Sequence, residues 1–249
     1  AMSNDYLLAI DCGTQSVRAL IFDLSGHLVD KSQVDITSYQ SPQPGWVEND
    51  PEEFWAVLCQ ACQRLWANTR VPKSSIRGVI ITTQRATTIN LDSHGQALRP
   101  AIVWLDQRRA DTKPKLAWWW EVALRAIGMR DTIGYFAREA EANWIAQHQA
   151  AIWARTDKYL LLSGYLNYRF PGRCVDSAAS QVGYIPFDYR RGRWAAGWDW
   201  KWQCLPIKRN MLPELVPAAT QLGLVGADAA RDSGIPEGLP VIAGAADKA

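Results

Sequence analysis

Residues 11–18 of the sequence, DCGTQSVR, combine the residue types that bind phosphate. Gly13 allows the backbone to turn tightly and to present successive N–H groups as an anion-binding nest. Three polar side chains follow it, those of Thr14, Gln15 and Ser16. Asp11 would repel a bare phosphate, whereas a partly hydrated Mg²⁺ between the two would join them, and Arg18 adds a further positive charge. Hairpins carry the same residue types merely to turn, so these residues alone leave both interpretations open.

A second carboxylate stands near the other end of the sequence, in GLPVIAGAADKA. The apolar run 240–243 is typical of a buried strand, and Asp247 follows it after Gly244 and two alanines. By its spacing alone Asp247 is a helix N-cap or a first-turn acid, because aspartate is favoured at both positions. A catalytic role therefore needs support from the rest of the chain.

The elements that would position these residues follow from hydrophobic patterning and turn residues. The predicted strands are 6–11, 18–23, 27–36, 76–82 and 240–243, with shorter candidates at 87–91 and 97–102. The first three are joined by short polar loops, which indicates an antiparallel meander. A helix is predicted at 51–67, helical patterns dominate 107–168, and the last third is rich in loops. Strands and helices in this order predict an α/β domain rather than a bundle or a sandwich.

The helix predicted at 51–67 also contains the one cysteine motif of the sequence. Asp50 is suited to the N-cap, and an apolar stripe runs along the helix. Cys59 and Cys62 form a C-x-x-C within it, a spacing that also occurs in redox and zinc sites. Cys62 lies on the apolar stripe, and no second C-x-x-C completes a zinc site, so a structural role is favoured.

Five segments resemble, in the same order, segments of the FGGY family of carbohydrate kinases. They are residues 11–18, GWVENDPEEFW (45–55), AIVWLDQRRAD (101–111), the helical region 143–180 with Trp144, Tyr165 and Asp176, and GLPVIAGAADKA (238–249). The resemblance covers almost the whole chain. It implies the ATPase fold shared with actin and hexokinase, an actin-like and ribonuclease H-like α/β lobe. Its mixed sheet would combine an early antiparallel meander with parallel strands, flanked by helices.

In that family two similar lobes clamp the nucleotide and the sugar between them. The resemblance implies that residues 4–246 form the N-terminal lobe and that residues 247–249 begin the hand-over to a C-terminal lobe. Residues 1–3, in which Ala1 precedes Met2, are interpreted as an expression scar and a disordered N-terminus. We expect negligible kinase activity from the chain alone, because the second lobe supplies another phosphate loop and the adenosine pocket. We also expect an exposed apolar face that favours homo-oligomers.

The resemblance further implies roles for individual residues, with ATP and Mg²⁺ as cofactors and a sugar or polyol as substrate. Asp247 matches the family's general base, which accepts the hydroxyl proton as the γ-phosphate is transferred. The nucleotide-binding positions are Asp11, Gly13, Thr14, Gln15, Ser16 and Arg18, with Asp11 also facing the metal. The positions that line the sugar pocket are Arg85, Trp104 and Asp106. An indole suits the C–H face of a polyol, and charged groups grip its hydroxyls. Without the resemblance, Trp104 is a core aromatic and Arg85 a surface cation.

Two positions depart from the family's pattern. Ala86 stands where glycerol kinases carry a glutamate after the arginine, which removes a hydroxyl acceptor and leaves room for a larger sugar. Glu141 stands where the helical region usually carries a lysine, three residues before Trp144. The departure at Ala86 puts glycerol in doubt as the substrate, and neither departure identifies another sugar.

Composition limits the remaining function classes. The net charge is +2 without a basic block, so nucleic acid is not expected as a partner. We expect no membrane partner, because no apolar run is long enough to span a bilayer and no signal-like segment is present. Five scattered cysteines favour reduced thiols and a cytoplasmic setting.

Two alternatives to a sugar kinase stay open. A nucleotide-dependent assembly or chaperone lobe of the same fold would need no sugar-pocket residues such as Trp104. A stand-alone module that binds carbohydrate or nucleic acid would use the 13 tryptophans, four of which, at 194–202, follow Arg190, Arg191 and Arg193. The more economical interpretation of this tryptophan cluster is a loop packed on the domain body, because no wider basic field accompanies it.

Overall fold

The computed structural model describes residues 5–111 and 113–245. Its strands are β1 (Tyr6–Cys12), β2 (Ser16–Asp23), β3 (Leu28–Asp35), β4 (Glu48–Asn49), β5 (Ile76–Thr83), β6 (Thr88–Leu91), β7 (Ala101–Ile102), β8 (Lys158–Leu161), β9 (Val175–Ser177), β10 (Phe187–Asp188), β11 (Arg193–Trp194), β12 (Glu214–Val216), β13 (Gln221–Leu224) and β14 (Pro240–Ala243). Its α-helices are α1 (Pro51–Asn68), α2 (Trp118–Ala126), α3 (Arg130–Glu139), α4 (Glu141–His148), α5 (Ala150–Arg155), α6 (Leu162–Arg169), α7 (Trp200–Cys204) and α8 (Ala227–Ser233). Three short 3₁₀ helices are η1 (Lys73–Ser75), η2 (Ala178–Ser180) and η3 (Arg209–Met211).

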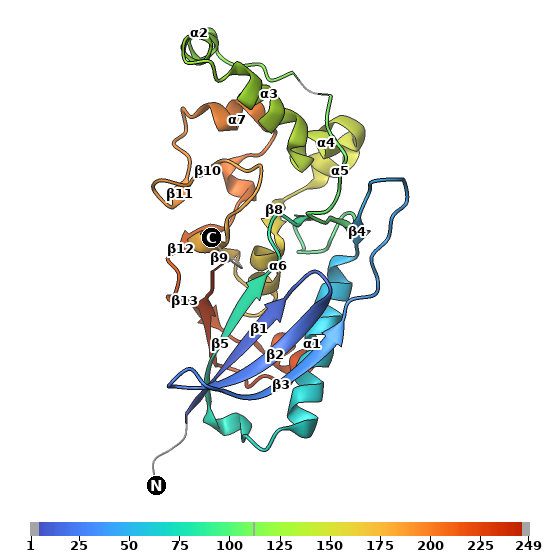
Figure 1. Cartoon of the computed structure of the whole chain (residues 1–249), viewed down its shortest axis with the longest axis vertical. Coiled ribbons are helices and arrows are strands. Elements are labelled where there is room, and N and C mark those ends of the chain that lie inside the picture. Colours follow the sequence, from blue (N-terminus) through green and yellow to red (C-terminus); the bar gives the residue numbers. More distant parts are fainter. Residues whose placement is uncertain (1–4, 112, 246–249) are drawn as a thin grey trace.

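A six-stranded mixed sheet forms the lower half of the molecule, in the order β13-β14-β5-β1-β2-β3 (Figure 1). Strands β1, β2 and β3 are antiparallel neighbours, which confirms the predicted meander. Strand β5 runs parallel to both β1 and β14. The predicted α/β lobe with a mixed sheet is therefore confirmed.

Helix α1 covers one face of this sheet. As expected, Asp50 caps the helix by accepting a hydrogen bond from the N–H of Glu52, and Pro51 occupies the first turn. The core between α1 and the strands is made of the side chains that point to this face, including Leu8 and Ile10 of β1. Cys62 is fully buried in that core, and burial raises the pKa of its thiol, which fits the structural role predicted for it.

The opposite face of the sheet is apolar but only half-buried. Its side chains alternate with the buried ones along each strand, and cross-strand pairing places them side by side. They are Leu7, Ala9, Leu20, Phe22, Ile80 and Ile242, which we call the open sheet face. In Figure 1 these strands lie in front of α1, so this face is turned toward the viewer.

The upper half of the molecule has a second core, built around the four-stranded sheet β4-β7-β6-β8 and the helices α2 to α5 and α7 (Figure 1). The prediction that helices dominate residues 107–168 was partly wrong. Residues 158–161 form strand β8, because their apolar side chains pair with β6 inside the sheet. The candidate strand 97–102 is reduced to the two residues of β7.

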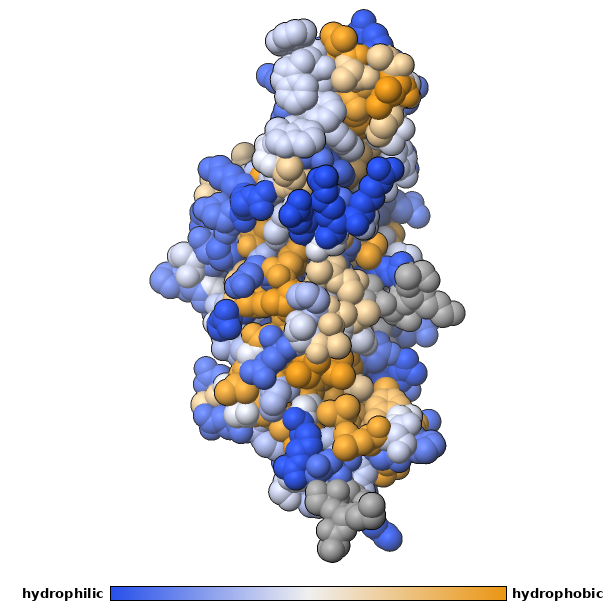
Figure 2. All heavy atoms as spheres, turned by 90° about the vertical axis from the view of Figure 1, so that its left-hand side faces the viewer, coloured by the Kyte–Doolittle hydropathy of each residue, from blue (hydrophilic) through white to orange (hydrophobic). Residues whose placement is uncertain are grey.

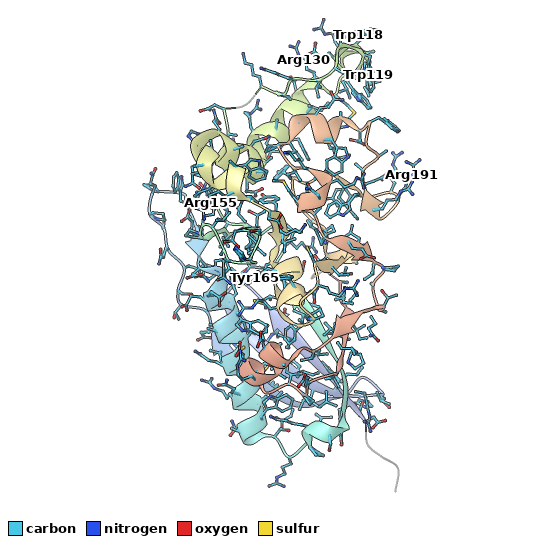
Figure 3. All side chains as sticks on the ribbon, turned by 180° about the vertical axis from the view of Figure 1, so that it is seen from behind. Trp118, Trp119, Arg130, Arg155, Tyr165 and Arg191 are labelled. Carbon is cyan, nitrogen blue, oxygen red and sulfur yellow. The ribbon has the colours of Figure 1, made fainter. Side chains whose placement is uncertain are left out.

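Most of the tryptophan cluster at 194–202 packs against the second core. Trp194, Trp200 and Trp202 are partly buried there, as expected of a loop packed on the domain body. Trp118 and Trp119 are exposed on α2, and Figure 3 shows both at the end of the molecule, with Arg191 on the loop between β10 and β11. Among the described residues, no helix has the length and apolar character needed to cross a membrane.

Candidate functional site

Three parallel strands end at the same edge of the large sheet. The register pairs Asp11 of β1 with Thr82 of β5, and Ile81 of β5 with Ala243 of β14. The segments that follow these strands therefore start at one edge, with neighbouring strands about 5 Å apart. In open α/β sheets this carboxyl edge is where ligands bind. The predicted base, Asp247, lies outside the described residues, and the described part of the segment after β14 ends at Ala245.

The loop between β1 and β2, residues 13–16, which we call the phosphate-type loop, directs its carbonyl groups into the protein. The Gly13 carbonyl accepts from Gln84 Nε2 at 3.2 Å, and the Thr14 carbonyl accepts from the Tyr39 hydroxyl at 2.6 Å. The carbonyls of residues 15 and 16 accept from backbone N–H groups. By contrast, the N–H groups of Thr14 and Gln15 donate to no acceptor within the described part of the chain. Free N–H groups on a loop with engaged carbonyls are what an anion-binding nest requires.

Asp11 and Arg18 face each other across this loop, on the paired strands β1 and β2. Arg18 donates to Asp11 Oδ2 from Nη2 and, at 3.2 Å, from Nε. The other carboxylate oxygen lies 3.4 Å from the hydroxyl of Thr82. The Arg18 side chain is half exposed, so its positive charge also lies at the open end of the loop.

Trp104 is brought directly to the phosphate-type loop. Its indole Nε1 donates to Thr14 Oγ1 at 2.9 Å, and the residue is 49 % exposed, so it is not a core aromatic. The Trp104 backbone N–H donates to Thr87 Oγ1, whose hydroxyl donates to Gln84 Oε1. Because Gln84 also holds Gly13, these bonds close a ring that we call the Trp104 ring. Two of its members, Gln84 and Thr87, were not predicted from the sequence.

Arg85 and Ala86 occupy the turn that follows β5, at the same edge. Ala86 has a φ of 54°, in the left-handed region that L-residues rarely adopt. Gly183 packs against it, because a Cβ built on that glycine would lie 3.6 Å from the Ala86 Cβ. Backbone strain of this kind concentrates at functional turns. Arg85 is half-buried and makes an interaction of its own, so it is not an idle surface cation.

Asp106 lies beneath Trp104, with a side chain that is 2 % exposed. Its oxygens accept from the N–H of Val47 at 2.7 Å and from the guanidinium and N–H of Arg108. Arg108 also binds Glu48, and its guanidinium lies 4.0 Å from the ring centroid of Trp46. Asp106 is therefore fully engaged within the protein and holds the segment that carries Trp104. The parts that Glu48 and Arg108 play in this network were not predicted from the sequence.

Asp176 and Ser177 of β9 reach the segment that leads toward Asp247. Asp176 is fully buried and accepts from Ser163, Asn167, Gln181 and the N–H of Ser177. Burial raises the pKa of its carboxyl, against the effect of these hydrogen bonds. Ser177 Oγ in turn donates to the Gly244 carbonyl at 2.5 Å.

Glu141 lies at the start of α4, near the carboxylates of Asp106 and Glu139. Burial raises the pKa of its carboxyl to about 7, and the negative charges of those two neighbours add to the effect. A lysine at this position, as in the family resembled, would place a positive charge beside them instead. The departure at Glu141 therefore leaves a carboxyl that titrates near neutral pH.

The side chains of this site can be compared with the ligands that Mg²⁺ requires. The described residues contain no cluster of three or more histidine, cysteine or acidic side chains of the kind that cages a metal ion. Mg²⁺ with a nucleotide needs less, because one or two carboxylates, phosphate oxygens and waters complete its shell. Asp11 offers one carboxylate at the carboxyl edge, beside the loop whose Thr14 and Gln15 N–H groups have no acceptor among the described residues. This donor set fits a metal that arrives with phosphate and does not fit a metal held by protein alone.

Comparison with known proteins places this site in context. The family model described as "FGGY family of carbohydrate kinases, N-terminal domain" matches residues 6–249. The glycerol kinase of Acidovorax sp. (strain JS42) is 31% identical over 238 residues, which cover 89% of this chain and 45% of the relative. The xylulose kinase of Klebsiella pneumoniae is 28% identical over 242 residues, which cover 97% of this chain and 48% of the relative.

Among solved structures, the xylulose kinase from Rhodospirillum rubrum superposes with a TM-score of 0.79. It is 27% identical, and the match covers 97% of this chain and 50% of that chain. The chain thus spans about half the length of the curated relatives that it matches.

Proposed function

This chain belongs to the FGGY family of carbohydrate kinases, and from that membership we propose that it is one lobe of an ATP-dependent sugar or polyol kinase. The lobe would bind the phosphates of ATP at residues 13–16 and present a carbohydrate hydroxyl to the γ-phosphate. The observation that carries the proposal is the link between the two halves of the site, the 2.9 Å hydrogen bond from Trp104 to Thr14. An assembly or chaperone lobe would have no need to join an exposed indole to its phosphate loop.

The phosphate end is supported by the geometry of the loop. The engaged carbonyls leave the N–H groups of Thr14 and Gln15 and the side chain of Ser16 to face a phosphate. Arg18 would neutralise part of the phosphate charge, as phosphoryl transfer requires. When bound with the nucleotide, Mg²⁺ would be held by Asp11 and would supply further charge neutralisation. Asp11 would then be shared between the metal and Arg18.

The sugar end is supported by Trp104 and by the turn at Arg85. The indole offers a flat apolar face for the C–H groups of a polyol, and Arg85 provides charged donors for its hydroxyls. We propose that Asp106 serves the substrate through Trp104, since its own oxygens are occupied within the protein. The small Ala86 leaves room beside Arg85 for a sugar larger than glycerol.

The proton acceptor in this proposal is Asp247. It would follow β14 at the carboxyl edge shared with the phosphate-type loop, and Ser177 holds the intervening segment at Gly244. A carboxylate suffices as the base, because the hydroxyl proton leaves late in a loose transition state. Positioning the hydroxyl in line with the γ-phosphate then contributes most of the rate.

The rest of the clamp would come from a C-terminal lobe. The relatives are about twice as long as this chain, and the open sheet face offers a broad apolar surface for further polypeptide. Figure 2 shows hydrophobic side chains at the surface of the lower half of the molecule, between polar ones. When an apolar surface of this kind is not covered by another part of the protein, it promotes association between copies of the chain.

The proposal is tested first by binding to this chain. Magnesium pyrophosphate should bind the wild-type chain and bind the Gln15→Pro variant much more weakly, since proline removes one of the two free N–H groups. Exposed Gln43→Pro, in the loop before β4, is the control for introducing a proline. In the protein that carries this chain together with its C-terminal lobe, Asp247→Asn should abolish sugar-dependent ADP release. Full ADP release by that variant, or equal binding by Gln15→Pro, would reject the proposal.

A further inference from the structure

In the hydrogen bond between Trp104 and Thr14, the chemistry of the indole determines which partner donates. An indole N–H has no acceptor capacity, so Thr14 Oγ1 must accept at 2.9 Å. The hydroxyl has a single proton, and this proton is then left to point elsewhere. Thr14 therefore keeps a donor available at the mouth of its loop.

Among the described residues, the Thr14 hydroxyl donates to no acceptor. The Thr14 carbonyl accepts from the Tyr39 hydroxyl, and the Gly13 carbonyl accepts from Gln84. The neighbouring N–H groups of Thr14 and Gln15 also lack acceptors within the described residues. Donors thus gather on one side of the loop and acceptors on the other, which is a favourable arrangement for an anion.

Trp104 itself is held rigidly enough to act on Thr14. Its backbone is bound to Thr87, and the Trp104 ring returns through Gln84 to Gly13, the residue before Thr14. Both ends of the contact therefore belong to one hydrogen-bonded ring. An indole fixed in this way orients the hydroxyl before any ligand arrives, so its ordering does not have to accompany binding.

We propose that Trp104 is a positioning residue for phosphate binding, in addition to its proposed contact with the sugar. Its indole N–H turns the Thr14 hydroxyl into a donor aimed at the phosphate. The inference rests on the proposed function, because it assumes that residues 13–16 bind phosphate. It also makes one side chain common to both substrates, so that phosphate at Thr14 changes the environment of the indole that the sugar covers.

The test measures the dissociation constant of magnesium pyrophosphate for the chain by NMR titration. Trp104→Phe keeps an aromatic face and removes only the N–H, and Thr14→Val keeps the shape and removes the hydroxyl. Each should weaken binding about threefold to tenfold, the value of one hydrogen bond. The double variant should be no weaker than either single one, and Thr14→Ser should bind like the wild type. Trp118→Phe, an exposed tryptophan at the far end of the molecule, is the matched control (Figure 3).

A second readout follows the indole directly. The Trp104 Nε1–H resonance, assigned by its loss in Trp104→Phe, should shift when magnesium pyrophosphate binds the wild-type chain, and should not shift in Thr14→Val. Additive losses in the double variant, or wild-type affinity in Trp104→Phe, would overturn this inference while leaving the phosphate site intact. No binding by the wild-type chain would instead overturn the proposed phosphate site, and this inference with it.

Discussion

Ser177 Oγ donates a hydrogen bond to the carbonyl of Gly244 at 2.5 Å, and so ties β9 to the segment that leaves β14. Replacing Ser177 with alanine should lower the free energy of unfolding by about 1 kcal/mol, because a buried carbonyl loses its donor. Urea denaturation measures this loss, and exposed Ser74→Ala is the control. In the protein with both lobes, Ser177→Ala should also lower kcat more than it raises KM, since the proposed base follows Gly244. Unchanged stability would show that the contact contributes nothing.

Asp176 is expected to be one of the most sensitive positions of the chain. Alanine at this position would remove the acceptor of Ser163, Asn167 and the Ser177 N–H in a fully buried site, and would leave the Gln181 amide with the Ser177 carbonyl. The expected loss is about 3 kcal/mol of unfolding free energy. Asp176→Asn keeps one oxygen and should lose less. The comparison is made by urea denaturation, and a loss below about 1 kcal/mol for alanine would contradict the role assigned to this carboxylate.

Glu141 should make the stability of the chain depend on pH. Its folded pKa of about 7 lies above its ordinary value of 4.5, so the folded state holds the proton more tightly than the unfolded state. Stability from this group is therefore full below pH 4.5 and is lost as the pH rises toward 7. Glu141→Gln should match the wild type at pH 4 and exceed it at pH 8 by about 2 kcal/mol.

Thermal unfolding between pH 4 and pH 8 measures this difference. Exposed Glu121→Gln removes a carboxylate of the same type from α2 and serves as the control. A constant difference between Glu141→Gln and the wild type across the range would show that Glu141 is not the titrating group.

Replacing Ala86 with glycine should make the folded chain more stable. Its φ of 54° costs energy for any residue with a Cβ, and glycine removes that cost. Ala86→Gly should therefore raise the free energy of unfolding by about 0.5–1 kcal/mol, even though glycine usually destabilises. Ala56→Gly, on the exposed side of helix α1, should show the usual loss. Destabilisation by Ala86→Gly would mean that the backbone at this turn is not strained.

The open sheet face should drive self-association of this chain. Phe22→Asp places a charge among its apolar side chains and should raise the dissociation constant of any dimer at least tenfold. Leu24→Asp makes a similar change in the neighbouring turn, at a side chain that is 67 % exposed, and should have little effect. Sedimentation equilibrium over a wide concentration range measures both variants. A wild-type chain that is monomeric throughout would remove the basis of this prediction.

The sheet and the first helix could be predicted from the sequence because their patterns are local. The meander, the cap at Asp50 and the buried strand near 76–82 each depend on residues close in the chain. Strand β8 could not be predicted in this way, since its apolar run fits a helix until β6 pairs with it. Strands β9, β12 and β13 were also not predicted, because they are short and each pairs with a strand that is distant in the sequence.

The site was predictable in its residue types and not in its connections. Thr14 was a candidate from the residue types of its loop and Trp104 from a family resemblance, and the structure brings them into contact. Nothing in the sequence indicated that Gln84 and Tyr39 would occupy the loop carbonyls, because these residues lie far apart along the chain. The phosphate-binding and sugar-binding roles, and the role of Asp247, stay predictions that the experiments above can decide.

Gly244 lies so close to β5 that a Cβ built on it would approach the carbonyl oxygen of Ile81 to 2.6 Å. No side chain fits at that distance, and the obstacle is backbone that cannot swing aside. A library carrying all twenty amino acids at position 244, selected only for correct folding, should therefore return glycine almost exclusively. The requirement to fold therefore already restricts position 244 to glycine, whatever catalysis requires there.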